Sequence, residues 1–341
     1  MKTYIMALLT PALLLASCTS DEGVQPQSDK SPITFSTAYV GNNSRTDPSM
    51  TTDSLSAFDV YGMIVNNGTT GQLTTDPLSV TRASSSNDWT YSPLQYWIDG
   101  TTYYFAAVWP TTITYTQTLA AGSEGDGSYT QTMRAGSFAN DGATDVIMAM
   151  PAGLLADGTM NPVTLTFSHL LSKVNLTFVN GFNSGSGVEL WVENVTLSGA
   201  CNKATALEVT GEKGDISINW TLDSSSTGTY TLRGMNTSYI SSTGTACEDP
   251  VLLFPDSSTA KYTVAFTVTI LQNGFYAEHY DLTATISGVE FKPGNAYNFT
   301  ATLDQTNVAD IPLKPIKFNL SSVTDWDQND ETLTTGNTTE N

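Results

Sequence analysis

The residues whose types could do chemistry are few in this chain, which contains three cysteines and two histidines. The histidines, His169 and His279, lie far apart, and no group of Cys, His and acidic residues has the spacing of a zinc site. The chain also lacks a Gly-x-Ser-x-Gly nucleophile elbow and a phosphate-binding loop. We therefore expect no enzyme activity, no metal site and no cofactor, which leaves the thiol of Cys18 as the candidate reactive group.

Cys18 follows a charged start at Lys2 and an apolar run that ends at Leu15. The run is too short to span a bilayer, and its shape is that of a secretory signal peptide. It does not end in an Ala-x-Ala cleavage site but in Ala16 and Ser17, two small residues directly before the cysteine. We therefore expect the rest of the chain to lie outside the cytoplasm.

This arrangement resembles the lipobox of bacterial lipoproteins. The resemblance implies that residues 1–17 are removed as a signal peptide and that the Cys18 thiol carries a diacylglycerol, followed by acylation of the new amine. Acyl chains contribute about 0.8 kcal/mol of membrane affinity per buried CH₂, and more than one chain makes the anchoring stable. The polar residues 18–30 then form a flexible tether. The alternative is a plain signal peptide whose cysteine is incidental.

Charge limits the classes of partner. Acidic residues outnumber basic ones by 33 to 13, which gives a net charge of −20. Nucleic-acid binding needs a basic surface, so the composition argues against that partner. It also argues against electrostatic attachment to anionic lipid, and no apolar run after the signal peptide approaches the roughly 18 residues of a transmembrane helix. We interpret the acidity as a source of solubility.

The two other cysteines are Cys201 and Cys247. Outside the cytoplasm they could form a disulfide bond, because that environment is oxidising. The sequence does not tell whether their Cα atoms come close enough to be bridged. A disulfide and two free thiols therefore both stay open.

The fold class follows from composition and periodicity. Thr, Ser, Gly and Asn are abundant beside Tyr, Phe and Val, which is typical of short strands joined by turns. The clearest alternation of apolar residues covers residues 262–270, and Asn273-Gly274 then predicts a hairpin with residues 276–286. We find no convincing amphipathic helix and no repeat of fixed period. These patterns predict an all-β fold built from β-sandwiches.

The length of the chain predicts two domains. We place an N-terminal β-sandwich domain at residues 31–160 and a C-terminal one at residues 161–326. The boundary is expected in the connector between Pro151 and Pro162. Residues 327–341 are acidic and polar, so we expect them to be disordered.

Aromatic residues are concentrated between Trp89 and Trp109. Exposed rings of this kind can stack on sugars, and the chain would then be a monomeric surface lipoprotein that binds glycans or a host ligand. Large rings are normally buried and dominate the interiors of β proteins, so we interpret this aromatic block as core.

Taken in order, several segments resemble the fimbrillin family, the lipoprotein pilins of type V pili. The first is the lipobox at Cys18, and the second is the stretch 33–37, followed by Arg45 and by residues 58–62. The third is the aromatic block, and the fourth is residues 165–174, Leu-Thr-Phe-Ser-His-Leu-Leu-Ser-Lys-Val. The stretches 316–319 and 323–326 near the end also fit.

The resemblance implies two transthyretin-like Greek-key β-sandwich domains. It also implies a lipid-anchored precursor at the cell outer membrane, which a trypsin-like protease cuts after the first strand. Here the cut maps to Arg45, which on its own could be an ordinary solvated charge. Loss of residues 33–40 would leave unpaired backbone groups, and a strand from another pilin subunit fills such a groove by donor-strand exchange.

Residues 316–326 contain the expected donor strand. Ile316, Phe318 and Leu320 alternate with polar residues, as a strand with one buried face requires. The product would be a fimbrium on the cell surface that supports adhesion. The sequence does not decide between stalk, anchor and tip roles.

Overall fold

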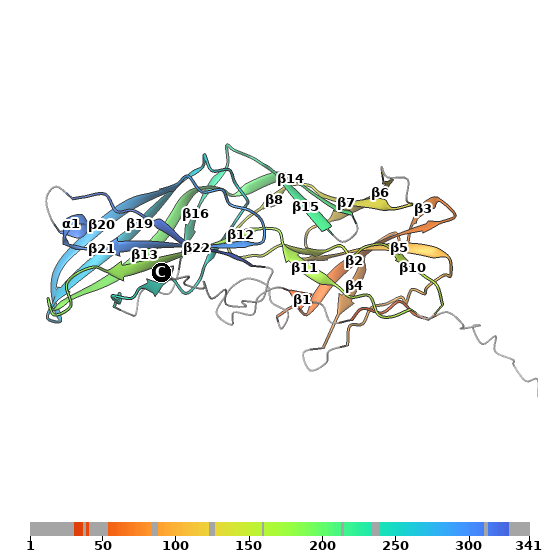
Figure 1. Ribbon diagram of the computed structural model, residues 1–341, viewed down its shortest axis with the longest axis horizontal. Helices are drawn as coiled ribbons and strands as arrows, with labels where there is room; N and C mark the ends of the chain where they lie inside the picture. Colours follow the sequence, from red (N-terminus) through yellow and green to blue (C-terminus); the bar gives the residue numbers. More distant parts are fainter. Residues whose placement is uncertain are drawn as a thin grey trace, which may run out of the picture.

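The computed structural model describes residues 31–36, 39–40, 54–83, 88–122, 127–158, 160–212, 215–232, 239–309 and 313–326. The molecule is elongated, with the strands of the first half at one end and most strands of the second half at the other (Figure 1). Strands dominate, and the helix found in the described residues is the single turn α1 (Gln305–Val308). The predicted all-β fold is confirmed. The two transthyretin-like Greek-key domains remain a prediction.

The first sheet lies in the N-terminal half. Its strand order is β1-β11-β9-β5-β2-β3, with β4 paired to β2 and β10 paired to β5. β1 runs parallel to β11, and the other pairs are antiparallel. The bounds are β1 (Tyr39–Val40), β2 (Ala57–Asn66), β3 (Thr69–Gln72), β4 (Leu78–Thr81), β5 (Thr101–Trp109), β9 (Ile147–Ala149), β10 (Leu154–Leu155) and β11 (Thr166–His169).

A second sheet covers one face of the first. Its order is β15-β14-β7-β6, with β8 paired to β14. The strands are β6 (Tyr115–Ala121), β7 (Tyr129–Ala135), β8 (Phe138–Ala139), β14 (Lys203–Glu212) and β15 (Asp215–Leu222). β14 comes from the far side of the expected domain boundary, yet it pairs with β7. Strands from both sides of residue 160 thus share one sheet.

The remaining two sheets pack face to face in the C-terminal half. One has the order β17-β12-β21-β22 with β18 beside β12, and the other has the order β16-β13-β19-β20. The bounds are β12 (Ser172–Asn180), β13 (Val188–Cys201), β16 (Thr227–Thr231), β17 (Thr245–Ala246), β18 (Val251–Leu253), β19 (Lys261–Gln272), β20 (Phe275–Ser287), β21 (Asn295–Leu303) and β22 (Asn319–Asp325). The predicted hairpin is confirmed, because Asn273 and Gly274 join β19 to β20 with φ values of 51° and 81°.

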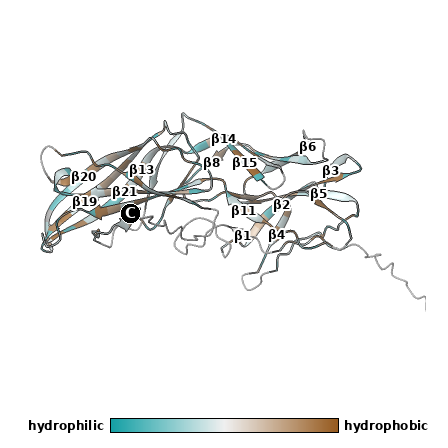
Figure 2. Cartoon of the chain, in the orientation of Figure 1, coloured by the Kyte–Doolittle hydropathy of each residue, from teal (hydrophilic) through white to brown (hydrophobic). Residues whose placement is uncertain are grey.

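Three clusters of buried apolar residues fill the spaces between these layers. The first-half cluster contains residues of β2, β4, β5, β9 and β11 together with Ile33 and Phe35. The central cluster lies between the first two sheets, and the second-half cluster lies inside the C-terminal sandwich. Hydrophobic stretches accordingly occur on strands at both ends of the molecule (Figure 2). β5 contributes to two clusters, which explains why its residues 103–108 are all buried rather than alternating.

Candidate functional site

Residues 31–36, together with β1, form what we call the first segment. It lies between two other parts of the chain and is hydrogen-bonded to both. The backbone N–H of Ile33 donates to the carbonyl of Gln95 at 2.8 Å. On the other side, Val163 donates to the carbonyl of Thr34 at 2.8 Å and accepts from the N–H of Ser36 at 2.9 Å. Residues 31–36 are therefore an inserted strand with neighbours on two sides, antiparallel at Pro32 and parallel at Phe35, whereas β1 pairs with β11 alone at the end of its sheet.

The side chains of Ile33 and Phe35 point into the first-half cluster. Ile33 is fully buried and Phe35 is 5% exposed, whereas Thr34 between them is exposed. The Phe35 ring lies 5.9 Å from the ring of Phe105 and 6.4 Å from that of Phe58, edge-on in both cases. Such contacts add to the free energy of burial that two large apolar side chains already contribute.

Tyr91 ties the same segment to the loop beside it. Its hydroxyl donates to the carbonyl of Ile33 at 2.8 Å and accepts from the backbone N–H of Gln95 at 3.2 Å. Its ring lies 5.7 Å from that of Phe35. Burial raises the pKa of the Tyr91 phenol above its ordinary value. A chain without the first segment would therefore present a slot with an aromatic wall and unpaired groups at Gln95 and Val163.

Residues 316–326 form the last segment, which contains β22. Ile316 and Phe318 are buried in the second-half cluster, where the Phe318 ring lies 5.4 Å from Phe178 and 6.3 Å from Phe266. The residues of β22 are all exposed, and the strand pairs with β21 on one side. The segment is thus held at its start by these side chains and by a parallel bridge between Lys317 and Thr285 of β20, while its middle is held by backbone bonds to β21.

The structure places two of the three predicted donor residues together. Ile316 and Phe318 share the interior, but Leu320 is 42% exposed. The register of β22 against β21 shifts between Leu320 and Ser322, and this bulge breaks the simple alternation that the sequence suggested. Whether these residues serve as a donor strand stays a prediction.

The first and last segments carry the same pair of apolar residues at the same spacing. Ile33-Thr34-Phe35 and Ile316-Lys317-Phe318 both place an isoleucine and a phenylalanine on one face, with a polar residue between them. In each segment the two apolar side chains are buried and the middle one is exposed. Sequence reasoning treated the two stretches separately and missed this match, although the residue types alone could have revealed it.

Trp326 closes the last segment in a socket of the central cluster. Its side chain is fully buried, and its backbone N–H donates to the carbonyl of Gly294 at 2.7 Å. The indole ring stacks on His169 with centroids 3.7 Å apart and planes 4° from parallel. The Lys173 ammonium lies 4.8 Å from the centroid of the same ring.

His169 is itself held by a buried carboxylate. Its Nδ1 lies 2.7 Å from Oδ2 of Asp145, and both side chains are fully buried. The backbone N–H of Val146 donates to Oδ1 of the same Asp145 at 2.8 Å. His169 is therefore a buried residue of the core. The described residues contain no cluster of His, Cys and acidic side chains that could hold a metal ion.

The aromatic block between Trp89 and Trp109 is mostly core, as interpreted from the sequence. The buried rings are those of Trp89, Trp97, Tyr103, Tyr104 and Phe105. Tyr96 is the exposed ring of this block at 44%. The most exposed aromatic side chains among the described residues lie elsewhere, at Phe275 and Tyr276 beside the β19–β20 turn. Most of the large rings of the block are therefore part of the core and are not free to stack on sugars.

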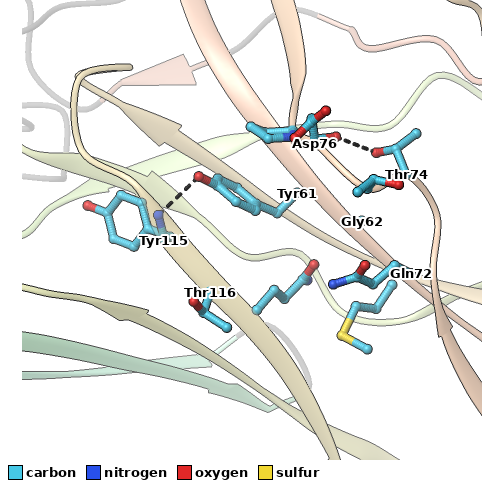
Figure 3. A pocket seen from close by; sticks show the side chains of 11 residues that line it. Tyr61, Gly62, Gln72, Thr74, Asp76, Tyr115 and Thr116 are labelled. Carbon is cyan, nitrogen blue, oxygen red and sulfur yellow. Dashed lines mark hydrogen bonds between the residues drawn. The ribbon is translucent and has the colours of Figure 1, made fainter.

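A hollow of about 220 Å³ opens beside β2, close to the start of β6 (Figure 3). Tyr61 lines it, and the Tyr61 hydroxyl accepts a hydrogen bond from the backbone N–H of Tyr115 at 3.0 Å. Tyr61 packs against the central cluster, whereas Phe58 on the same strand faces the first-half cluster. The hollow therefore lies on the opposite face of β2 from the first segment.

Two of the predicted site residues, Cys18 and Arg45, fall outside the described ranges, as do the signal peptide, the tether and the tail. Cys201 and Cys247 are both free thiols. Burial, with a further contribution from Asp249, raises the pKa of the Cys247 thiol to about 12. No helix in the described ranges is long and apolar enough to cross a membrane.

Comparison with known proteins gives a family match over most of the chain. The model of the family described as fimbrillin-like matches residues 44–326. A fimbrial protein from Bacteroides vulgatus is similar in structure, with a TM-score of 0.51, 14% identity, and coverage of 86% of this chain and 99% of that one. Its likeness shows the fold. A search of curated proteins finds no match.

Two further solved structures are similar at lower scores. A protein from Bacteroides uniformis, named as a candidate for cell adhesion, has 16% identity and a TM-score of 0.48, covering 87% of this chain and 99% of that one. The tip fimbrial protein Mfa3 from Porphyromonas gingivalis has 9% identity and a TM-score of 0.35, covering 80% and 95%.

Proposed function

The chain belongs to the fimbrillin-like family, and from this premise we propose that it is a structural subunit of a cell-surface fimbria, assembled by donor-strand exchange. In this proposal it is not an enzyme. Its precursor carries a lipid on Cys18 that anchors it in the outer membrane, and a trypsin-like protease cuts after Arg45. The partners are other pilin subunits, and the fimbria supports adhesion.

The observation that carries this proposal is the match between the first and last segments. A donor that places Ile316 and Phe318 where Ile33 and Phe35 lie would refill the same apolar wall with the same two side-chain types. The direction follows from the order of these residues, so the donor would run parallel to β11, as β1 does. Backbone bonds to Gln95 and Val163 would supply affinity, and the alternating side chains would set the register.

Removal of the first segment supplies the reason for exchange. Each buried backbone group left without a partner costs about 1–3 kcal/mol, and each large apolar side chain withdrawn from the core loses about 1.5–3 kcal/mol of burial. A donor from a neighbouring chain restores both contributions. The donor leaves its own pocket around Phe178 and Phe266 to do so, so the net free energy of exchange is the gain from filling the slot minus the cost of emptying that pocket.

The decisive experiment is made on the native surface protein. Intact mass and N-terminal sequence, with boiled and unboiled gel lanes, should give a mature chain that starts at Thr46 and a ladder that heat abolishes. An Arg45→Ala chain should keep its first segment and give a single band, while Arg134→Ala, which alters an exposed arginine paired with Glu208, should assemble normally. Assembly of Arg45→Ala at the wild-type level would refute the assignment of Arg45.

A peptide competition tests the exchange step by itself. A synthetic peptide of residues 31–40, added during processing, should occupy the slot and shorten the ladder. The control peptide exchanges Ile33 and Phe35 for serine and should have no effect. If both peptides shortened the ladder equally, or if neither did, the slot would not recognise the side chains of Ile33 and Phe35.

The alternative is a monomeric surface lipoprotein that binds glycans through the aromatic block. The burial of its main rings, including Trp89 and Trp97, removes the basis of that alternative. A diacylated chain that starts at Cys18 and runs as a single band would nevertheless restore a tethered monomer as the functional form.

A further inference from the structure

The socket of Trp326 lies where the first and last segments meet. Trp326 stacks on His169, which is the last residue of β11. β11 is also the strand that pairs with β1, through Tyr39 with Thr166 and Val40 with Phe167. One residue, Ser168, separates the last of these pairs from His169. The N-terminal end of β11 therefore contacts the first segment, and its C-terminal residue contacts the end of the last segment.

The last segment depends on this socket. Between Phe318 and Trp326 every residue of β22 is exposed, and the side chains in this stretch add little burial. Trp326 is fully buried, and its Nε1 has no hydrogen-bond partner among the described residues, so stacking and packing hold it rather than a polar contact of the indole. An edge strand held at two ends opens when one end is released.

We propose that Trp326 is a positioning residue that retains the last segment, and that β11 couples its release to loss of the first segment. With the first segment in place, β1 pairs with Thr166 and Phe167 of β11, and β9 pairs with Ser168 and His169. Without it, β11 becomes an edge strand that keeps β9 alone. His169 itself pairs with Ile147 of β9 in either case, but the strand that carries it is then fixed through β9 alone, and the surface on which Trp326 stacks is less firmly held.

This inference rests on the proposed function and adds an order of events to it. A precursor would keep its last segment docked, so it could not donate before it is processed. The partner it selects is a second copy of this chain that has already lost its own first segment. The two segments would thus be linked within each subunit, and assembly would be confined to processed chains.

The test measures hydrogen exchange of the amides of β22 in monomeric full-length protein. Trp326→Ala should speed exchange at residues 319–325 by about a hundredfold, because truncation of a buried Trp removes most of the anchoring at this end. Val323→Ala, on the same strand but exposed, should leave the exchange rates unchanged. If Trp326→Ala does not fold, Trp326→Phe keeps a stacking ring and should give a smaller acceleration of the same amides.

Coupling is tested by weakening the first segment at a distance. Phe35→Ala should speed exchange at residues 319–325 by about tenfold when Trp326 is present, and should add nothing in a chain that already carries Trp326→Ala. The matched control is Leu78→Ala, which truncates a buried side chain of the same first-half cluster on β4 and should leave β22 unchanged. Equal acceleration by Leu78→Ala, or additive effects of Phe35→Ala and Trp326→Ala, would overturn the inference.

The same measurements separate this inference from the proposed function. Exchange is measured on monomers and does not require a polymer. If exchange is coupled in a chain that never forms a ladder, the link between the two segments through Trp326 is supported and the fimbrial role is refuted. A heat-sensitive ladder from a chain with uncoupled exchange would do the reverse.

Discussion

The first and last segments carry the same Ile-x-Phe pattern, but the molecule holds them in different ways. The first is inserted between residues near Gln95 and Val163, with Phe35 inside a cluster of aromatic rings. The last lies at a sheet edge, with an exposed middle and anchors at Phe318 and Trp326. An inserted strand leaves only if the chain is cut, whereas an edge strand can peel away. This difference supports the proposal that the first segment is removed and the last segment is donated.

The largest effect is expected from truncating the anchor of the inserted segment. Phe35→Ala should lower the free energy of unfolding by about 3–5 kcal/mol, because a buried ring is lost and its aromatic neighbours cannot collapse fully into the space. Urea unfolding followed by tryptophan fluorescence measures the change. The neighbouring Thr34→Ala, at an exposed position, should stay within about 0.5 kcal/mol of wild type. A small effect of Phe35→Ala would mean that the segment is not inserted.

The corresponding change in the last segment should cost less. We expect Phe318→Ala to lower the free energy of unfolding by about 3 kcal/mol, at the low end of the range for such truncations, because an edge segment can relax into the space. The measurement is again urea unfolding, with the exposed Leu320→Ala as the matched variant of the same segment. If Leu320→Ala lowered the free energy of unfolding more than Phe318→Ala, Phe318 would not be the side chain that anchors this segment.

A polar contact of the inserted segment predicts a smaller, pH-dependent effect. Tyr91→Phe removes the hydroxyl that bridges Ile33 and Gln95 and should cost about 1–1.5 kcal/mol at neutral pH. Because burial raises the pKa of this phenol in the folded chain, the unfolded chain loses its proton first as pH rises. The stability that Tyr91 contributes is therefore complete below about pH 10 and is lost above it.

Thermal unfolding between about pH 9 and 11 checks the sign of this effect. The wild-type transition temperature should fall more steeply than that of Tyr91→Phe, and the two curves should converge as the pH rises. Parallel curves would mean that the Tyr91 hydroxyl is not buried against the first segment.

The two thiols are predicted to differ in chemical reactivity, which can be tested without changing the stability of the chain. At pH 8 a maleimide reagent should label Cys201, which is partly exposed, and should leave Cys247 unmodified until the chain unfolds. The reason is that burial raises the pKa of the Cys247 thiol to about 12, so almost no thiolate is present. Mass spectrometry of the labelled chain distinguishes the two sites. Labelling of Cys247 in the native protein would show that the C-terminal sandwich opens in the folded chain and exposes this thiol.

Local patterns were sufficient for several parts of this structure. The alternation along residues 262–270 and the Asn273-Gly274 turn identified a hairpin, because a half-buried strand and a tight turn each restrict the residue types at neighbouring positions. Apolar rings at Trp89 and Trp97 were assigned to the core because burial of their area dominates any other use of them. The all-β class and the family likeness follow from such patterns repeated in order.

Long-range pairing was beyond those patterns. Nothing in the sequence near Ile33 states that its neighbours are Gln95 on one side and Val163 on the other, or that β14 joins β7 across the expected domain boundary. The register shift that leaves Leu320 exposed, and the stacking of Trp326 on His169, likewise arise between segments distant in the chain. By itself the sequence determined which stretches become strands and which of their faces are apolar, since both depend on neighbouring residues. Only the tertiary structure decided which strand is inserted and which lies at an edge, because the same Ile-x-Phe face fits either place and the partners that distinguish them come from elsewhere in the fold.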